Sequence, residues 1–147
     1  MTLAKEFFTG GRAVFTVDSQ GAGFPEATDK APRRYTYKIN KKKCDDGRDI
    51  FFVGVLTGPE NTMDYQYLGC LDDKTGCVRL TQASKSSEES TVYRAANWAL
   101  RHIWADRELP DPYRVMHEGR CGVCGRALTV PESIETGIGP VCAARMN

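Results

Sequence analysis

The chain has 147 residues and nearly equal numbers of basic and acidic side chains, 20 against 19, so its formal net charge is only +1. This balance argues against a protein that holds nucleic acid by bulk charge. With 41% hydrophobic residues, the chain is long and apolar enough for one globular domain of about 100 residues and a small additional segment. No apolar run is long enough for a signal peptide or a membrane span, which predicts a cytoplasmic protein with no membrane partner.

Alternating hydrophobicity predicts β-strands in the first half of the chain. Apolar and polar residues alternate over 13–17 and again over 34–39, so each run has one face for a core. The run 50–56 is almost wholly apolar, which predicts a central strand buried on both faces, or nearly so. Two further runs, 65–71 and 77–80, follow turn residues. Such short, closely spaced strands favour an antiparallel meander of four or five strands.

A capping box predicts where a long helix begins. Ser86 suits the N-cap and Glu89 suits the position three residues later, so we expect a helix from there to about Asp106. Six apolar side chains share one stripe that would lie on the sheet: Val92, Ala95, Ala96, Ala99, Leu100 and Ile103. The predicted fold class is α+β, with a four- to five-stranded meander packed by one long helix over residues 1–108 and a small lobe over 109–147.

The helix also presents an aromatic side chain between two arginines. Trp98 falls away from the apolar stripe, with Arg94 and Arg101 four and three residues from it. Such a group can stack on a nucleobase or anchor a protein partner. The alternative is that Trp98 packs under the C-terminal lobe as an ordinary apolar contact.

Four side chains of metal-binding type stand close together near the C-terminus. His117, Cys121, Cys124 and Cys142 give the pattern His-x3-Cys-x2-Cys-x17-Cys, whose ligand types and local spacings suit one tetrahedral Zn²⁺. Four protein ligands leave no open position, so we expect this zinc to be structural and to hold the lobe together. The alternatives are a disulfide, or three ordinary buried thiols with a surface histidine.

The lobe has few apolar residues with which to build a core of its own. We expect them to form a miniature core that needs metal to be stable: Leu128, Val130, Ile134, Ile138 and Val141. Two short helices are predicted around them, and the second would deliver Cys142 on its first turn. Chelation should therefore loosen this lobe.

The stretch 121–142 reads CGVCGRALTVPESIETGIGPVC. It resembles the core of a small domain of unknown function that recurs in bacteriophage and bacterial proteins, with the pattern CGxCGRxLTxPESIxxGIGPxC. The residues upstream resemble, more loosely, a phage-type partner domain of that tail. The resemblance implies a zinc site and a phage or prophage origin, hence a host cytoplasm, but no activity.

Charge is distributed unevenly along the chain. Residues 30–43 include seven basic and no acidic side chains, whereas 49–73 include five acidic and no basic ones. Lys41, Lys42 and Lys43 have three interpretations: a solvated hairpin tip, a phosphate contact, or a docking patch for an acidic protein surface. Periodicity places the tyrosines of the preceding strand on the buried face, which weakens a role in stacking.

The remaining candidate residues do not make a catalytic set. The sequence has no nucleophile motif and no glycine-rich phosphate loop, and its only histidines are His102 and His117, so we expect no enzyme. Cys44, Cys70 and Cys77 are expected to be free thiols. The alternative is that Cys70 and Cys77 face each other across a hairpin as a second metal site or a redox pair.

Binding is therefore the predicted function, and two partner classes stay open. The first is a host protein or complex, which the chain would modulate or inhibit, with antidefence proteins included in this class. The acidic segment favours it, because an acidic face can occupy a nucleic-acid groove on a target. The second is nucleic acid, with the chain as an accessory factor in phage DNA or RNA metabolism. The basic run favours this second class.

Overall fold

A computed structural model describes residues 3, 5–24, 34–57, 65–129 and 131–146 of the chain. Five residues used in the predictions lie outside the described residues. They are Lys30 and Arg33 of the basic run, Glu60 and Asp64 of the acidic segment, and Val130 of the predicted miniature core. The strands are β1 (Arg12–Asp18), β2 (Arg34–Lys43), β3 (Asp49–Leu56), β4 (Tyr65–Leu71), β5 (Val78–Arg79) and β6 (Arg114–His117). The helices are α1 (Lys5–Phe8), α2 (Thr91–Trp104), α3 (Pro131–Thr136) and α4 (Pro140–Met146).

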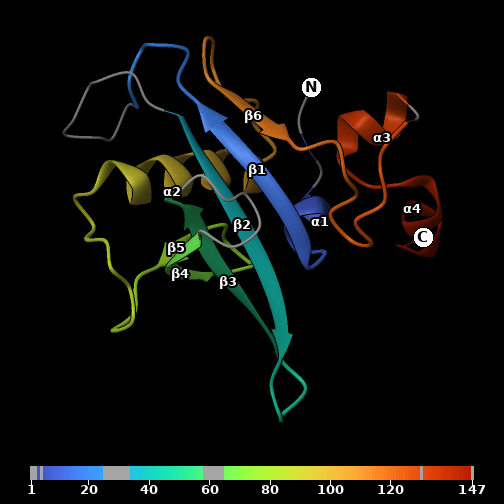
Figure 1. The fold of residues 1–147 in the computed structure, drawn as a ribbon, viewed down its shortest axis with the longest axis horizontal. Helices are drawn as coiled ribbons and strands as arrows, with labels where there is room; N and C mark the ends of the chain where they lie inside the picture. Colours follow the sequence, from blue (N-terminus) through green and yellow to red (C-terminus); the bar gives the residue numbers. More distant parts are fainter. Residues whose placement is uncertain (1–2, 4, 25–33, 58–64, 130, 147) are drawn as a thin grey trace.

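The six strands form one antiparallel sheet in the order β5-β4-β3-β2-β1-β6 (Figure 1). Strands β1 to β5 are consecutive neighbours, which confirms the predicted meander. The sixth strand was not predicted. It comes from the segment assigned to the C-terminal lobe and pairs with β1 from Phe15 opposite His117 to Asp18 opposite Arg114. The lobe is thus joined to the sheet by backbone hydrogen bonds.

One face of the sheet is buried. Alternate side chains of the strands enter a single hydrophobic core that also takes in α1 and the buried stripe of α2. Its largest fully buried members from the sheet are Phe15, Val17, Tyr37, Ile39, Val53, Leu68 and Val78. Each such side chain contributes roughly 1.5–3 kcal/mol when it leaves water. We call this face the inner face.

Helix α2 is shorter than predicted and begins later. Its N-cap is Ser90, whose Oγ accepts a hydrogen bond from the Tyr93 backbone N–H, so the expectation that Ser86 caps the helix was wrong. The Ser90 Oγ also donates to the carbonyl of Ser87, which fixes the preceding turn. Hydrogen bonds join α2 to the sheet at two points: Tyr37 Oη donates to the Val92 carbonyl, and Asn97 Oδ1 accepts from the Val78 N–H.

The opposite face of the sheet, which we call the outer face, is half-exposed. Every second residue of β3, including Phe52 and Leu56, lies on it and is only partly buried. The expectation that 50–56 is buried on both faces was therefore wrong. An apolar run cannot distinguish a strand covered twice from one whose second face carries partly exposed apolar side chains.

Candidate metal centre and binding surfaces

Three cysteines meet at the C-terminal end of the fold. Cys121 and Cys124 lie on a tight turn, in which the Gly125 N–H donates to the Cys121 carbonyl and the Cys121 N–H to the carbonyl of Arg126. Cys142 comes from the first turn of α4. The three Sγ atoms lie within 4.8 Å of one another.

This cluster fits a zinc ion. Thiolates that bind one Zn²⁺ at about 2.3 Å in tetrahedral geometry have their sulfurs about 3.8 Å apart, so only a small contraction would be needed. Cys121 and Cys142 are buried, whereas Cys124 is exposed and forms the open side of the cluster. Within the described residues no fourth metal-binding side chain joins this group.

The thiols of Cys121 and Cys142 have pKa values shifted in opposite directions. Burial raises the pKa of Cys121, but hydrogen bonds from the backbone N–H groups of Gly139, Cys124 and Val123 outweigh it and lower that pKa to about 7. Burial, together with hydrogen bonds to the other two thiols, raises the pKa of Cys142 to about 11. Binding a dication would release the remaining thiol protons, so metal affinity should decrease as the pH falls.

His117 lies outside the cysteine cluster, contrary to the predicted ligand set. Its Nδ1 accepts a hydrogen bond of 2.8 Å from the Gly119 N–H, which leaves Nε2 to donate to the carbonyl of Ile134 in α3. Both ring nitrogens are therefore used in joining β6, the turn and α3. Proximity in sequence suggested His117 as a ligand, but the chain aims its ring at the backbone of α3.

We expect His117→Ala to retain zinc, because the ring contacts backbone groups and not the cysteine cluster. The substitution removes two hydrogen bonds, each worth about 0.5–1.5 kcal/mol, so the melting temperature should fall. Elemental analysis of His117→Ala and Cys121→Ser, purified side by side, measures this. Loss of zinc from both variants would restore His117 as the fourth ligand.

The metal centre is built onto the sheet through α1. The Arg12 N–H at the start of β1 donates to the Gly122 carbonyl over 2.8 Å. A Cβ on Gly122 would lie 2.4 Å from the Phe7 carbonyl oxygen, and one on Gly137, whose φ is +80°, would lie 2.5 Å from the Phe7 ring. Only glycine allows this close approach. Phe7 is therefore clamped between the two glycines. Since Phe7 is also part of the hydrophobic core, it connects the lobe to that core.

The predicted miniature core was only partly right. Ile138 is buried with Cys121 and Cys142 in the same core as the sheet, and Leu128 packs against it. Ile134 and Val141, however, are 46% and 53% exposed. The lobe shares the core of the sheet, because α1 and β1 supply apolar surface that the C-terminal sequence does not contain.

Trp98 is buried, with 7% of its surface exposed. Its ring lies edge-on to Tyr113, with 4.8 Å between ring centroids, and 4.6 Å from His102. It thus packs under the segment that leads to β6, and it offers no exposed platform for a base or a partner. Arg94 and Arg101 donate from Nε to backbone carbonyls near α2, of Glu88 and Asn97.

Lys41, Lys42 and Lys43 are exposed on the hairpin of β2 and β3, which projects beyond the rest of the fold (Figure 1). Acidic side chains stand beside them: Asp49 is the strand partner of Lys43, and Asp46 makes an ion pair with Arg48 in the turn. The tip therefore carries mixed charge. The described acids of the 49–73 segment, Asp49, Asp72 and Asp73, lie at ends of strands and do not form a continuous acidic face.

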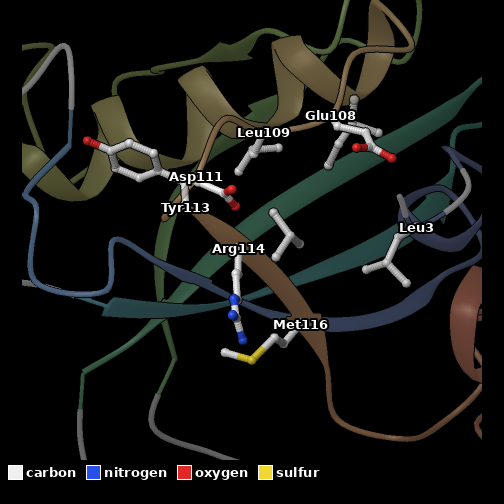
Figure 2. Close-up of a pocket in the computed structure, with 9 residues that line it drawn as sticks. Leu3, Glu108, Leu109, Asp111, Tyr113, Arg114 and Met116 are labelled. Atoms are coloured by element: carbon white, nitrogen blue, oxygen red, sulfur yellow. The ribbon is translucent and has the colours of Figure 1, made fainter. Parts of the chain in front are cut away.

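A hollow of about 340 Å³ lies beside the edge strand β6 (Figure 2). Its walls come from the end of α2, the segment after it, and β6, and they mix apolar with charged side chains. Arg114 and Met116 point to the same side of β6, and Leu3 closes the hollow from the N-terminal segment (Figure 2). Met116 is 38% exposed.

Sequence reasoning missed the outer face as a candidate binding surface. The strand register brings basic side chains of four strands onto it, with others at its borders: Arg12, Arg34, Lys38, Lys42, Arg79, Arg114 and Arg120. Three partly exposed aromatic side chains, Phe52, Tyr65 and Tyr67, lie on the same face. The polar residues of each alternating strand could have indicated this surface, but they were interpreted only as solvent-exposed.

Comparison with known proteins bears on the C-terminal segment alone. Residues 115–147 match a family of unknown function (DUF6011), and this range contains β6 except its first residue, α3, α4 and the three clustered cysteines. No curated protein and no solved structure matches the chain. In the described part of the chain, every helix is too short or too polar to cross a membrane.

Proposed function

We propose that this chain is a nucleic-acid-binding accessory protein that uses the outer face of its sheet, with a structural zinc in the cysteine cluster. One observation carries the proposal: basic and aromatic side chains share a half-exposed face of four neighbouring strands. Basic groups that follow a phosphate backbone, combined with aromatic groups on which bases stack, are what single-stranded nucleic acid requires.

The low net charge of the chain does not oppose this proposal, because charge on the outer face is locally positive. The one acidic side chain of β1 on this face, Asp18, stands directly between two arginines, Arg34 on β2 and Arg114 on β6. Its carboxylate also accepts hydrogen bonds from Gln20. A balanced chain can therefore still present a basic surface of limited area.

The role that we propose for the zinc ion is structural. The turn that holds Cys121 and Cys124 also positions Arg120 at the border of the outer face, where Arg120 donates to the Gly125 carbonyl over 3.1 Å. Zinc would thus fix one end of the binding surface. A reduced cytoplasm is the compartment we propose, because it keeps such thiols available for metal.

The test is the salt dependence of binding to short labelled single-stranded DNA and RNA. We expect Arg12→Ala with Lys38→Ala to weaken binding and to lower the salt slope by about 0.7 for each phosphate that the variant no longer binds. Replacing Lys41 and Lys43 by serine is the matched control, because these two residues lie on the projecting hairpin and the strand register places them on the other side of β2 from the outer-face Lys38 and Lys42. That control should change the free energy of unfolding by no more than about 0.5 kcal/mol. Absence of binding at low ionic strength would refute the proposal.

A protein-directed modulator of a host machine is a second candidate, and the edge strand β6 favours it. An extended segment of a partner protein can pair with an exposed strand edge while its side chains fill a neighbouring hollow. The hollow of Figure 2 lies beside that edge and includes the exposed Met116. Leu109→Ser, which changes a side chain of the hollow that lies on no strand of the outer face, should then weaken capture of the host protein while leaving nucleic-acid binding unchanged, which separates the two candidates.

A further inference from the structure

Two cavities adjoin on the outer face, and they differ in charge. The first, of about 180 Å³, lies over β1, β2 and the ends of β3 and β4. The second, of about 480 Å³, continues along β1 and β2 toward the metal centre. Val14 and Glu118 line both, so the two cavities are direct neighbours, and we refer to them together as the groove.

The first cavity, which we call the small cavity, is part apolar and part polar. The residues that line it include Val14, Thr16, Thr36, Leu56, Tyr65 and Glu118. Its volume is below the roughly 300–1,000 Å³ of pockets for drug-sized ligands, so it suits a single ring system. The hydroxyls of Thr16 and Thr36 lie 2.7 Å apart and bind each other.

Tyr65, which lines this cavity, carries a buried and unsatisfied hydroxyl. Within the described part of the chain, its Oη is the one buried side-chain oxygen or nitrogen without a hydrogen-bond partner. Burial, and then the charge of Glu118, raise the pKa of Tyr65, so the hydroxyl stays protonated and can donate. A buried hydroxyl without a partner is unfavourable, and a bound polar ligand would satisfy it.

The second cavity, which we call the basic cavity, is suited to phosphate. It is lined by three cations, Arg12, Lys38 and Arg120, against one carboxylate, Glu118, together with the amide of Asn40. The Nζ of Lys38 lies over the ring of Tyr65, 5.6 Å from its centre, and Tyr65 lines the small cavity. The register of β1 and β2 places Thr16, Val14 and Arg12 in a row opposite Thr36, Lys38 and Asn40. That row spans about 13 Å at about 3.3 Å per residue.

We propose that the groove binds one nucleotide of a single strand, with an amino-bearing base in the small cavity and its phosphate in the basic cavity. This inference rests on the proposed function and names the site that reads the strand. The cations decide the orientation, because Arg12, Lys38 and Arg120 line the basic cavity and not the small one. Glu118, which lines both cavities, can accept a hydrogen bond from a base amino group. Uracil presents a carbonyl oxygen where cytosine presents that amino group, so Glu118 disfavours uracil.

The experiment measures binding of labelled oligocytidylate and oligouridylate, which share ring size and backbone. We expect the wild-type protein to prefer oligocytidylate, on the order of tenfold, as for other carboxylate contacts to a base amino group. Glu118→Gln should abolish the preference, because an amide can rotate to serve either base. Glu89→Gln removes the same charge from an exposed position outside the groove and should keep the preference.

Tyr65→Phe provides a second and independent variant. It removes only a hydroxyl that has no partner in the free protein, so the melting temperature should stay the same or rise. Binding of both oligonucleotides should nevertheless weaken several-fold. If the melting temperature of this variant is unchanged, its weaker binding cannot be explained by misfolding.

The outcomes separate this inference from the proposed function. If neither oligonucleotide binds the wild-type protein at low salt, both fail. If both bind equally well, or if Glu118→Gln and Tyr65→Phe behave as the wild type does, the nucleotide site is overturned while binding by the outer face stands. A preference for oligocytidylate that Glu118→Gln removes, with Glu89→Gln unchanged, supports the site.

Discussion

Trp98→Ala should destabilise the protein by about 3–5 kcal/mol, because it removes a buried aromatic side chain and leaves a cavity behind. The indole packs against Tyr113 and His102, and Tyr113 in turn donates its hydroxyl to the Gly23 carbonyl over 2.6 Å. The cavity would therefore loosen the segment between α2 and β6 as well. For a chain of this size the melting temperature should fall on the order of 10 °C.

Trp98→Phe is the matched control for this prediction. It keeps an aromatic ring between α2 and Tyr113, so its loss of stability should be clearly smaller than that of Trp98→Ala. Thermal and denaturant unfolding of both variants measure the difference. If Trp98→Ala melts with the wild type yet loses a binding partner, the side chain is exposed in solution and the helix face is a working surface.

The meander and the cysteine cluster could be predicted from the sequence because both depend on local pattern. Two-residue alternation fixed the inner face of β1 and β2, and it places Tyr37 correctly in the core. The Cys-x2-Cys turn, with a third cysteine at the start of α4, brought three thiols together as expected. The fourth ligand was assigned by proximity to His117, and orientation of a side chain is not encoded by spacing.

The parts that could not be predicted depend on contacts between distant segments. Strand β6 has four residues and no distinctive pattern of its own; it becomes a strand because the edge of β1 is available to it. Trp98 is off the apolar stripe of α2 and is nevertheless buried, since Tyr113 covers it from outside the helix. The outer face was missed for a related reason. In the sequence, its aromatic residues lie in apolar runs that predict burial. The strand register is needed to show which of them lie on the half-exposed face.

Removal of the metal should unfold the C-terminal end while leaving the centre of the sheet folded. At a thousandfold excess of zinc over its Kd, binding stabilises the folded state by about 4 kcal/mol, which chelation would remove. Cys121 and Cys142 would then remain buried without the ion that links them. Because Phe7 is clamped by glycines of the lobe, α1 should loosen together with α3 and α4.

Hydrogen exchange with and without chelator tests this pattern directly. Protection should be lost in α1, β6 and residues 119–129 and 131–146, while β2, β3 and β4 keep theirs, since they lie in the middle of the sheet away from the lobe. Cys142→Ser should reproduce the chelated pattern and lose zinc, whereas Cys44→Ser, at the β2–β3 turn, should do neither. Uniform loss of protection would mean that the sheet depends on the metal as a single cooperative unit. No loss anywhere would mean that the shared core, and not the ion, holds the lobe to the sheet.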